Sequence, residues 1–263
     1  MAKTALITGA SGGIGYELAK VFATNDYDLI LVARSTDKLQ QIQAELTQSN
    51  NVQAHVLSFD LSQPESPSKL FEQVQQQGLT VDVLINNAGF ADYGPFADCN
   101  WAKHSALLQL NMVTLTHLTR LFLPPMLERG YGKILNVAST AAFQPGPYMA
   151  AYYASKSYVM SFTEALAHEV KGTGVTAMVL CPGPTRGTDF QARANLGDIE
   201  FFKQLKLPNA TDVAQFGYDA LGRNQVVAVH GIFNRLLVFT NRLMPRQAVT
   251  DTIGRLQEPK ESV

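Results

Sequence analysis

Residues 5–33 read ALITGASGGIGYELAKVFATNDYDLILVA and set the class of fold. An apolar run lies at each end of this stretch, and a glycine cluster follows the first run. An apolar run that ends in glycines is typical of a buried strand followed by a tight turn. Between the runs, residues 13–24 carry apolar side chains on one helical face, namely Ile14, Leu18, Val21 and Phe22. The stretch therefore predicts a strand, a turn, a helix and a second strand.

The rest of the chain continues this alternation. Apolar runs predict strands at residues 52–57, 81–85, 133–137, 175–180 and 225–229. Helical patterns predict helices at residues 36–48, 64–77, 101–127 and 148–171. Pro124 and Pro125 interrupt the third of these helical patterns. The strand runs are apolar on both faces, as in parallel strands that helices cover on both sides. We expect an α/β fold, a doubly wound Rossmann-type sheet, in a single domain spanning residues 1–263.

Two segments extend this plan. Residues 184–208 follow a strand at the carboxyl edge of the sheet, where open α/β sheets bind ligands, so we expect this segment to contact substrate. Residues 231–255 follow the last strand and alternate apolar side chains with arginines. Such an amphipathic helix can lie on a membrane surface, but it more often packs on its own protein or on a neighbouring subunit.

Composition excludes several classes of protein. The 263 residues carry a net charge of −1, without the basic excess of nucleic-acid-binding proteins. The five histidines show no metal-ligand spacing, so no metal is expected. The two cysteines, Cys99 and Cys181, form no CxxC pair and are expected as free thiols in a reducing compartment. Neither a signal peptide nor a membrane span is apparent, which predicts a cytoplasmic protein.

The glycine cluster after the first strand predicts a phosphate site. Glycines let the backbone turn tightly and approach a pyrophosphate, and the N-terminus of the following helix offers free N–H groups. The residues expected to contact a cofactor here are Gly9, Ser11, Gly12, Gly13, Ile14 and Gly15.

A competing interpretation uses the same residues. Gly9-Ala10-Ser11-Gly12-Gly13 also satisfies the G-x-S-x-G pattern of a hydrolase nucleophile, with Ser11 between a strand and a helix. Only eight residues precede Gly9, so no upstream oxyanion segment accompanies it. A triad would need a histidine such as His168 or His230, and neither has a distinctive context. The serine hydrolase remains a remote alternative.

Further motifs follow in a fixed order along the chain. TGxxxGxG at residues 8–15 is followed by Asn86-Asn87-Ala88-Gly89, Asn111, Ser139, Tyr152-xxx-Lys156 and Pro182-Gly183. This order and spacing resembles the classical short-chain dehydrogenases/reductases over about residues 1–230. The resemblance implies a seven-stranded parallel sheet of order 3-2-1-4-5-6-7 that binds NAD(H) or NADP(H).

Tyr152 and Lys156 have a catalytic rationale of their own. They lie four positions apart on a predicted helix, so their side chains share a face. A nearby ammonium lowers the pKa of a phenol, which favours proton transfer near neutral pH. Tyr152 would exchange a proton with the carbonyl or alcohol oxygen, and Ser139 would stabilise charge on that oxygen. The resemblance further implies that Lys156 holds the nicotinamide ribose and that Asn111 completes a proton relay.

Strand residues 28–33 end in Ala33, where NAD enzymes carry an acidic residue, and Arg34 follows. Because a guanidinium pairs well with phosphate, we expect NADP(H) rather than NAD(H). The resemblance adds cofactor contacts along the other strand ends, at Asp60, Leu61, Asn87, Ala88, Gly89, Pro182, Gly183, Thr185 and Thr188. The family often has threonine five residues after the proline, whereas this chain has Gly187 there and Thr188 next.

The sequence thus predicts an NADP(H)-dependent oxidoreductase that interconverts a carbonyl and an alcohol. The apolar segments 90–96, 140–148 and 184–207 favour an apolar small-molecule substrate, such as a steroid, fatty or aromatic compound. The alternative from another class is an NADP(H)-binding sensor or scaffold without turnover. By analogy with the family, we expect a homodimer or homotetramer.

Overall fold

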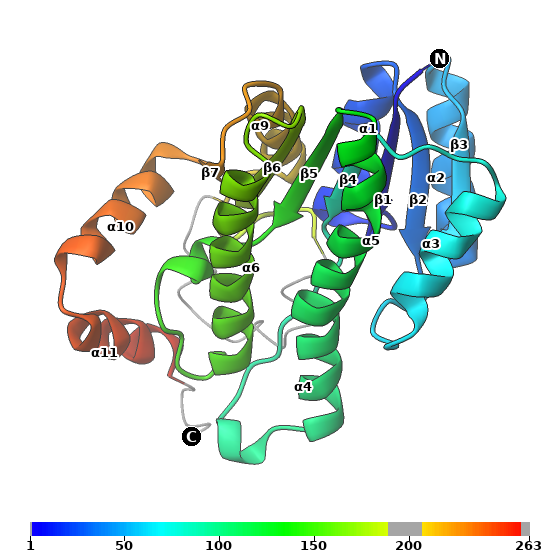
Figure 1. Ribbon diagram of the computed structural model, residues 1–263. Helices are drawn as coiled ribbons and strands as arrows, with labels where there is room; N and C mark the ends of the chain where they lie inside the picture. The colour runs from blue at the N-terminus through cyan, green and yellow to red at the C-terminus, as the bar shows by residue number, and fades with distance from the viewer. Residues whose placement is uncertain (1, 189–206, 259–263) are drawn as a thin grey trace.

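The computed structural model describes residues 2–188 and 207–258, and its centre is a parallel sheet (Figure 1). The strands are β1 (Thr4–Thr8), β2 (Asp28–Ala33), β3 (Ala54–Ser58), β4 (Val83–Asn86), β5 (Gly132–Val137), β6 (Val175–Cys181) and β7 (Val227–Val229). Their order is β3-β2-β1-β4-β5-β6-β7, and every pair is parallel. β1 lies between β2 and β4, with Ile7 opposite both Leu31 and Ile85. The predicted fold class and strand order are confirmed.

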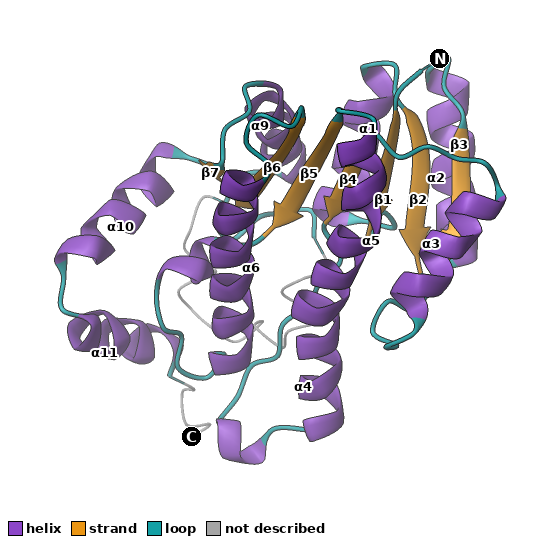
Figure 2. Cartoon of the chain, in the orientation of Figure 1, coloured by secondary structure: helices purple, strands orange, loops and turns teal. Residues whose placement is uncertain are grey.

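Helices cover both faces of this sheet (Figure 2). On one face lie α1 (Gly13–Thr24), α2 (Thr36–Ser49) and α9 (Ala210–Gly222). The other face is covered by α3 (Ser66–Gln76), α5 (Leu115–Glu128) and α6 (Ala150–Glu169). α4 (Trp101–Leu108) leads into α5. α10 (Ile232–Leu243) and α11 (Arg246–Gln257) follow β7 and lie beyond that edge of the sheet.

The strand residues divide between two apolar layers. In β2, Leu29 and Leu31 pack with α1, α2 and α9, whereas Ile30 and Val32 pack with the helices of the opposite face. This alternation follows from the two-residue period of a strand, which sends successive side chains to opposite faces. Because both faces are covered, strands of this kind must be apolar throughout, as the sequence pattern indicated.

The predicted helix at 101–127 is three elements rather than one. A π-helical turn, η2 (Gln109–Thr114), separates α4 from α5. α5 continues through Pro124 and Pro125 to Glu128, because Phe122 and Met126 on its inner face are fully buried in the core. Tertiary packing therefore outweighs the helix-breaking tendency of the two prolines. Among the described residues, no helix has the length and apolar character needed to span a bilayer.

Candidate active site

The turn between β1 and α1 presents an open helix N-terminus. Gly9 and Gly13 have φ angles of 68° and 56°, in the left-handed region that glycine adopts without strain. Gly12 caps α1 without a side-chain hydrogen bond, and the first turn of the helix contains no acidic residue. The N–H groups at this end are therefore available to an anion, and no carboxylate competes for them.

The end of β4 braces this turn. Thr8 Oγ1 accepts hydrogen bonds from the backbone N–H groups of Asn87 and Ala88, at 2.9 and 3.0 Å. Asn87 Nδ2 donates to the carbonyl oxygens of Thr8 and Gly9, at 2.9 and 3.4 Å. A Cβ on Gly15 would lie 2.3 Å from the Gly9 carbonyl oxygen. Gly15 therefore permits close packing between helix and turn, and it does not line the cavity beside them.

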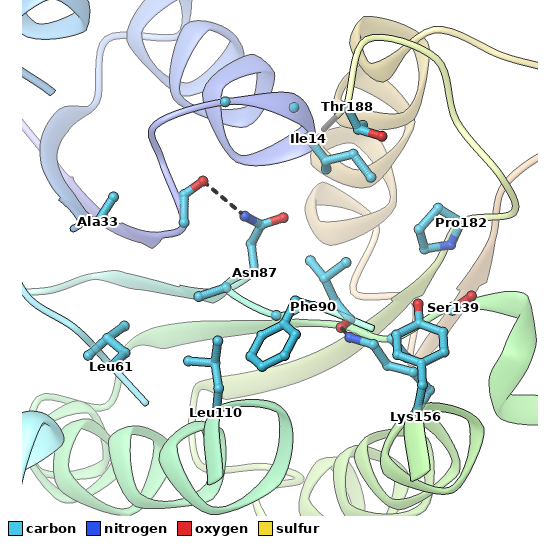
Figure 3. Close-up of a pocket in the computed structure, with 18 of the residues that line it drawn as sticks. Ile14, Ala33, Leu61, Asn87, Phe90, Leu110, Ser139, Lys156, Pro182 and Thr188 are labelled. Atoms are coloured by element: carbon cyan, nitrogen blue, oxygen red, sulfur yellow. Dashed lines mark hydrogen bonds between the residues drawn. The ribbon is translucent and has the colours of Figure 1, made fainter. Parts of the chain in front are cut away.

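A cavity of about 620 Å³ runs along the carboxyl ends of the strands (Figure 3). Apart from Gly15 and Asn111, every residue predicted for the cofactor or the chemistry lines it. These are Gly9, Ser11, Gly12, Gly13, Ile14, Arg34, Asp60, Leu61, Asn87, Ala88, Gly89, Ser139, Tyr152, Lys156, Pro182, Gly183, Thr185 and Thr188. Its size, glycine walls and open helix end fit a bound dinucleotide.

Two basic side chains lie where β2 leads into α2. Arg34 and Lys38 both line the cavity there, together with Ser35. Asp60 faces the same region, and its Oδ1 accepts hydrogen bonds from the backbone and hydroxyl of Ser62, at 3.1 and 2.7 Å. Burial acts to raise the pKa of Asp60, but these hydrogen bonds and the charge of Arg34 outweigh it and lower that pKa. Lys38 and Ser35 were not among the residues predicted from the sequence, although Lys38 lies in the first turn of α2, four positions after Arg34.

Ser139, Tyr152 and Lys156 meet on the far side of the cavity. Ser139 follows β5, and its Oγ accepts a hydrogen bond from the Ala141 backbone N–H at 3.1 Å. Lys156 Nζ lies 5.7 Å from the centre of the Tyr152 ring and donates to the Val137 carbonyl oxygen at 2.9 Å. Tyr152 and Lys156 are both buried and lie on α6, as their four-residue spacing predicted.

Burial dominates the titration of this pair. Desolvation raises the pKa of Tyr152, and hydrogen bonding with Ser139 only partly opposes it. The expected lowering by Lys156 is therefore not the larger effect in this structure. Desolvation also lowers the pKa of Lys156 to about 8, because the interior disfavours its charged form.

Asn111 lies behind the cavity wall rather than in it. It sits in the π-helical turn, nearly fully buried, and its Oδ1 accepts from the Phe90 backbone N–H at 3.2 Å. Its Nδ2 donates to the Phe90 carbonyl and to Ser155 Oγ, both at 3.1 Å. Asn111 thereby ties the segment after β4 to α6, the helix that carries Tyr152. A π-helical turn is frequent at functional sites.

The segment after β6 folds back toward the glycine turn. Gly187 has a φ of 75°, a conformation that a threonine would adopt only with strain. Thr188 follows, and its side chain would lie 3.2 Å from a Cβ placed on Gly13. Glycine thus stands where the family often has threonine because the chain turns there, and Thr188 reaches the cavity instead. Most of the predicted substrate segment, at 189–206, lies outside the described residues.

Apolar side chains dominate the wall opposite the glycine turn. Phe90, Ala106, Leu110, Ala141, Met149 and Tyr153 line it. Lys103 lines it as well, in an ion pair with Asp92. The hydroxyl of Tyr153 accepts a hydrogen bond from Gln257 Nε2 at 2.6 Å, so the end of α11 is attached to this wall. Tyr153 and Gln257 were not among the residues predicted from the sequence, since no local pattern links residues so far apart.

Other chemistries find less support in these residues. None of the described residues lining the cavity is a histidine, so Ser11 lacks the base of a hydrolase triad there. In the described part of the chain, no group of three histidine, cysteine, aspartate or glutamate side chains is arranged to hold a metal ion.

Comparison with known proteins identifies the family. The family model described as short chain dehydrogenase matches residues 3–198. The ketoacyl reductase HetN of a Nostoc species is 37% identical over 69% of this chain and 63% of its own length. The very-long-chain 3-oxoacyl-CoA reductase of Anas platyrhynchos is 33% identical over 68% of this chain and 58% of its own length. The matched segment thus spans less than two thirds of both relatives.

A solved structure covers nearly the whole chain. A short-chain dehydrogenase from Sphingobium yanoikuyae, in complex with NADPH, superposes with a TM-score of 0.82 and is 27% identical. The superposition covers 99% of this chain and 98% of that protein. Together with the match of the family model over residues 3–198, this likeness shows that the chain belongs to the short-chain dehydrogenase/reductase family.

Proposed function

We propose that this protein is an NADP(H)-dependent oxidoreductase that interconverts a carbonyl and an alcohol, with Tyr152 as the general acid and base. The observation that carries the proposal is the meeting of Ser139, Tyr152 and Lys156 at the end of a cavity whose other end is a glycine-rich helix N-terminus. The bound nicotinamide would supply or accept the hydride.

The protein's own residues handle the proton. Ser139 Oγ already accepts a hydrogen bond from the Ala141 N–H, so its hydroxyl hydrogen can point toward a substrate oxygen. Tyr152 donates its phenolic proton to that oxygen during reduction and takes it back during oxidation. The ammonium of Lys156 stabilises the phenolate formed when the proton leaves, because the interior screens the two charges weakly.

The glycine turn and the β2–α2 junction would hold the cofactor. The N-terminus of α1 binds the pyrophosphate, and the side chains of Arg34 and Lys38 bind the 2′-phosphate that distinguishes NADP(H). Ala33 supports this preference, because its methyl group offers no acceptor to a free 2′-hydroxyl.

The apolar wall favours a substrate that is apolar around its reacting carbonyl or alcohol group. Two relatives are named as reductases of oxoacyl compounds, so a long-chain 3-oxoacyl thioester belongs among the candidates. Cyclic and aromatic ketones complete a panel that matches the side chains opposite the glycine turn.

The test measures the decrease in NADPH absorbance when the purified protein is incubated with each compound of this panel. The Tyr152→Phe variant should lose about 10²–10⁴-fold in kcat, since the positioned proton donor is gone, yet bind NADPH as the wild type does. The matched control is Tyr158→Phe, which removes an exposed hydroxyl from the same helix and should keep full activity. Wild-type protein that binds NADPH but reduces nothing in the panel would point to a sensor or scaffold instead.

A further inference from the structure

Within residues 2–188 and 207–258, α10 contacts the rest of the protein along one side. Val238 is buried, Asn234 packs so closely on Gly183 that a Cβ there would lie 2.7 Å from its Nδ2, and Asn241 hydrogen-bonds Gln144. Residues 234, 238 and 241 follow a spacing of four and three, so they share one face of the helix. That face turns toward the fold, and Figure 1 shows the helix lying at the edge of the molecule.

The opposite face of α10 is apolar and exposed. Ile232 is 87% exposed, Leu243 is 71% exposed and Phe233 is 63% exposed. Half of the large apolar side chains exposed in the described part of the chain fall within residues 232–244, namely Ile232, Phe233, Leu236, Leu237, Phe239, Leu243 and Met244. We call these seven residues the outer face. So dense a group of exposed apolar side chains marks a binding surface rather than ordinary scatter.

The charged residues within the segment that carries the outer face are all of one sign. Residues 231–250 contain Arg235, Arg242 and Arg246 and no aspartate or glutamate, although the whole chain has a net charge of −1. Arg235 and Arg242 lie seven positions apart and therefore on the same side of α10, between the outer face and the attached face. Arg235 is fixed there, because its Nε donates to the Val229 carbonyl at 3.0 Å.

We propose that the outer face binds the surface of an anionic lipid membrane. An apolar helix face bordered by arginines is the arrangement that sinks into the headgroup boundary while its cations meet lipid phosphates. A second copy of the chain fits less well. A two-fold contact pairs a patch with itself, and residues 231–250 hold no carboxylate, so this segment of one copy offers no partner for the arginines of the other.

The attachment of this segment places the membrane near the cavity. A Cβ on Gly183 would lie 2.7 Å from Asn234 Nδ2, and Gly183 lines the cavity. The following helix, α11, ends at Gln257, which is hydrogen-bonded to Tyr153 in the cavity wall. Lipid binding is independent of the reaction catalysed, so its outcome can be separated from that of the proposed function.

Sedimentation of the full-length protein with vesicles tests the proposal. Wild-type protein should bind vesicles of phosphatidylcholine that contain 30% phosphatidylglycerol. Its affinity for vesicles of phosphatidylcholine alone should be at least ten-fold lower. Binding should weaken as salt is raised. The Phe233→Ser/Phe239→Ser double variant should lose at least ten-fold in binding, because two side chains that enter the lipid are gone.

Two further variants make the result specific. Arg235→Gln/Arg242→Gln should remove the preference for anionic vesicles and its salt dependence. Val113→Ser/Leu127→Ser changes two exposed apolar residues on other helices and should bind like the wild type. Circular dichroism establishes that each variant is folded.

Three results would overturn the proposal. The first is that the wild type does not bind anionic vesicles, and the second is that it binds neutral and anionic vesicles equally. The third is that the phenylalanine double variant binds as strongly as the wild type. Light scattering addresses the rival occupant. A wild-type dimer without vesicle affinity, which becomes a monomer in the phenylalanine double variant, would assign the outer face to a second copy of the chain.

Discussion

Lys156 carries an ammonium group into the interior of the protein. Only 6% of the residue is exposed, and burial lowers its pKa from 10.5 to about 8. The unfolded chain therefore binds the proton more tightly than the folded chain does. At neutral pH this difference opposes folding, and stability gains as pH rises from about 8 to 10.5. The difference between the pKa of 10.5 in the unfolded chain and about 8 in the folded chain corresponds to about 3 kcal/mol in the free energy of unfolding.

Replacing this lysine should reveal that cost. The Lys156→Met variant should gain stability relative to the wild type at pH 7, and this gain should shrink by about 2 kcal/mol at pH 10. Urea unfolding of both proteins at both pH values measures the change. The loss of the hydrogen bond to Val137 offsets part of the gain at either pH, so only the difference between pH values is diagnostic. Lys171→Met, at an exposed lysine, should show no such difference, and an identical gain at pH 7 and pH 10 would contradict the prediction.

Arg34 is the residue on which cofactor preference should depend. Arg34→Ala should weaken NADPH binding about 10- to 100-fold, because a charge-assisted contact to the 2′-phosphate is lost. NADH binding should change less than about two-fold, since NADH has no such phosphate. Fluorescence titration with both cofactors measures the two affinities.

Neighbouring lysines provide the comparison for Arg34. Lys38→Ala should act in the same direction with a smaller effect, because Lys38 lines the same end of the cavity. Lys69→Ala, on the exposed surface of α3, should leave both affinities unchanged. Equal losses of NADPH and NADH binding in the Arg34 variant would refute the assignment.

At the scale of an element, two glycines at the turn between β1 and α1 have different structural roles. Gly12 has an extended φ of 172°, and a Cβ there would meet no atom within 4 Å. A Cβ on Gly15 would collide with the Gly9 carbonyl oxygen at 2.3 Å. One glycine thus keeps space open in the cavity, while the other lets the helix pack onto the turn.

The two alanine variants should therefore fail in different ways. Gly12→Ala should keep the melting temperature of the wild type but lose at least about ten-fold in NADPH affinity, because its methyl group occupies the phosphate site. Gly15→Ala should lose about 1–3 kcal/mol of stability through overpacking. Thermal unfolding and cofactor titration on each variant distinguish them. A Gly12→Ala protein that binds NADPH normally would argue against a phosphate at this turn.

At the scale of the molecule, the cavity joins both halves of the sheet. Its walls come from residues after β1, β2 and β3 on one side and after β4, β5 and β6 on the other. α1 and α9 also pack together across one face, although they lie far apart in sequence. A cofactor in this cavity would hold the two halves in one cooperative unit.

Calorimetry tests that single-domain expectation. The protein should unfold in one transition, and NADPH at 100 times its dissociation constant should raise the midpoint by about 5 to 10 °C. NADH at the same concentration should give a smaller shift. Two separate transitions, or a shift confined to part of the unfolding enthalpy, would show that the halves behave as distinct domains.

Much of the fold and of the site is encoded in short stretches of sequence. Continuous apolar runs and the helical period of apolar side chains predict the strands and most of the helices to within about two residues at most ends, whereas α9 was not predicted. The glycine turn and the Tyr152–Lys156 pair are equally local, because the backbone alone brings residues four apart onto one helical face. The strand order was implied by the family resemblance, and the structure confirms it.

Only the tertiary structure decides what depends on distant contacts. Burial, which is the largest cause of the raised pKa of Tyr152, comes from the packing of several elements around α6. Gln257 reaches Tyr153 across 104 residues of chain, and no periodicity records such a meeting. The side of α10 that is exposed to solvent is likewise determined by the packing of the helix beside Gly183 and not by its own sequence. Local patterns specify backbone conformation, whereas desolvation and exposure are properties of the assembled chain.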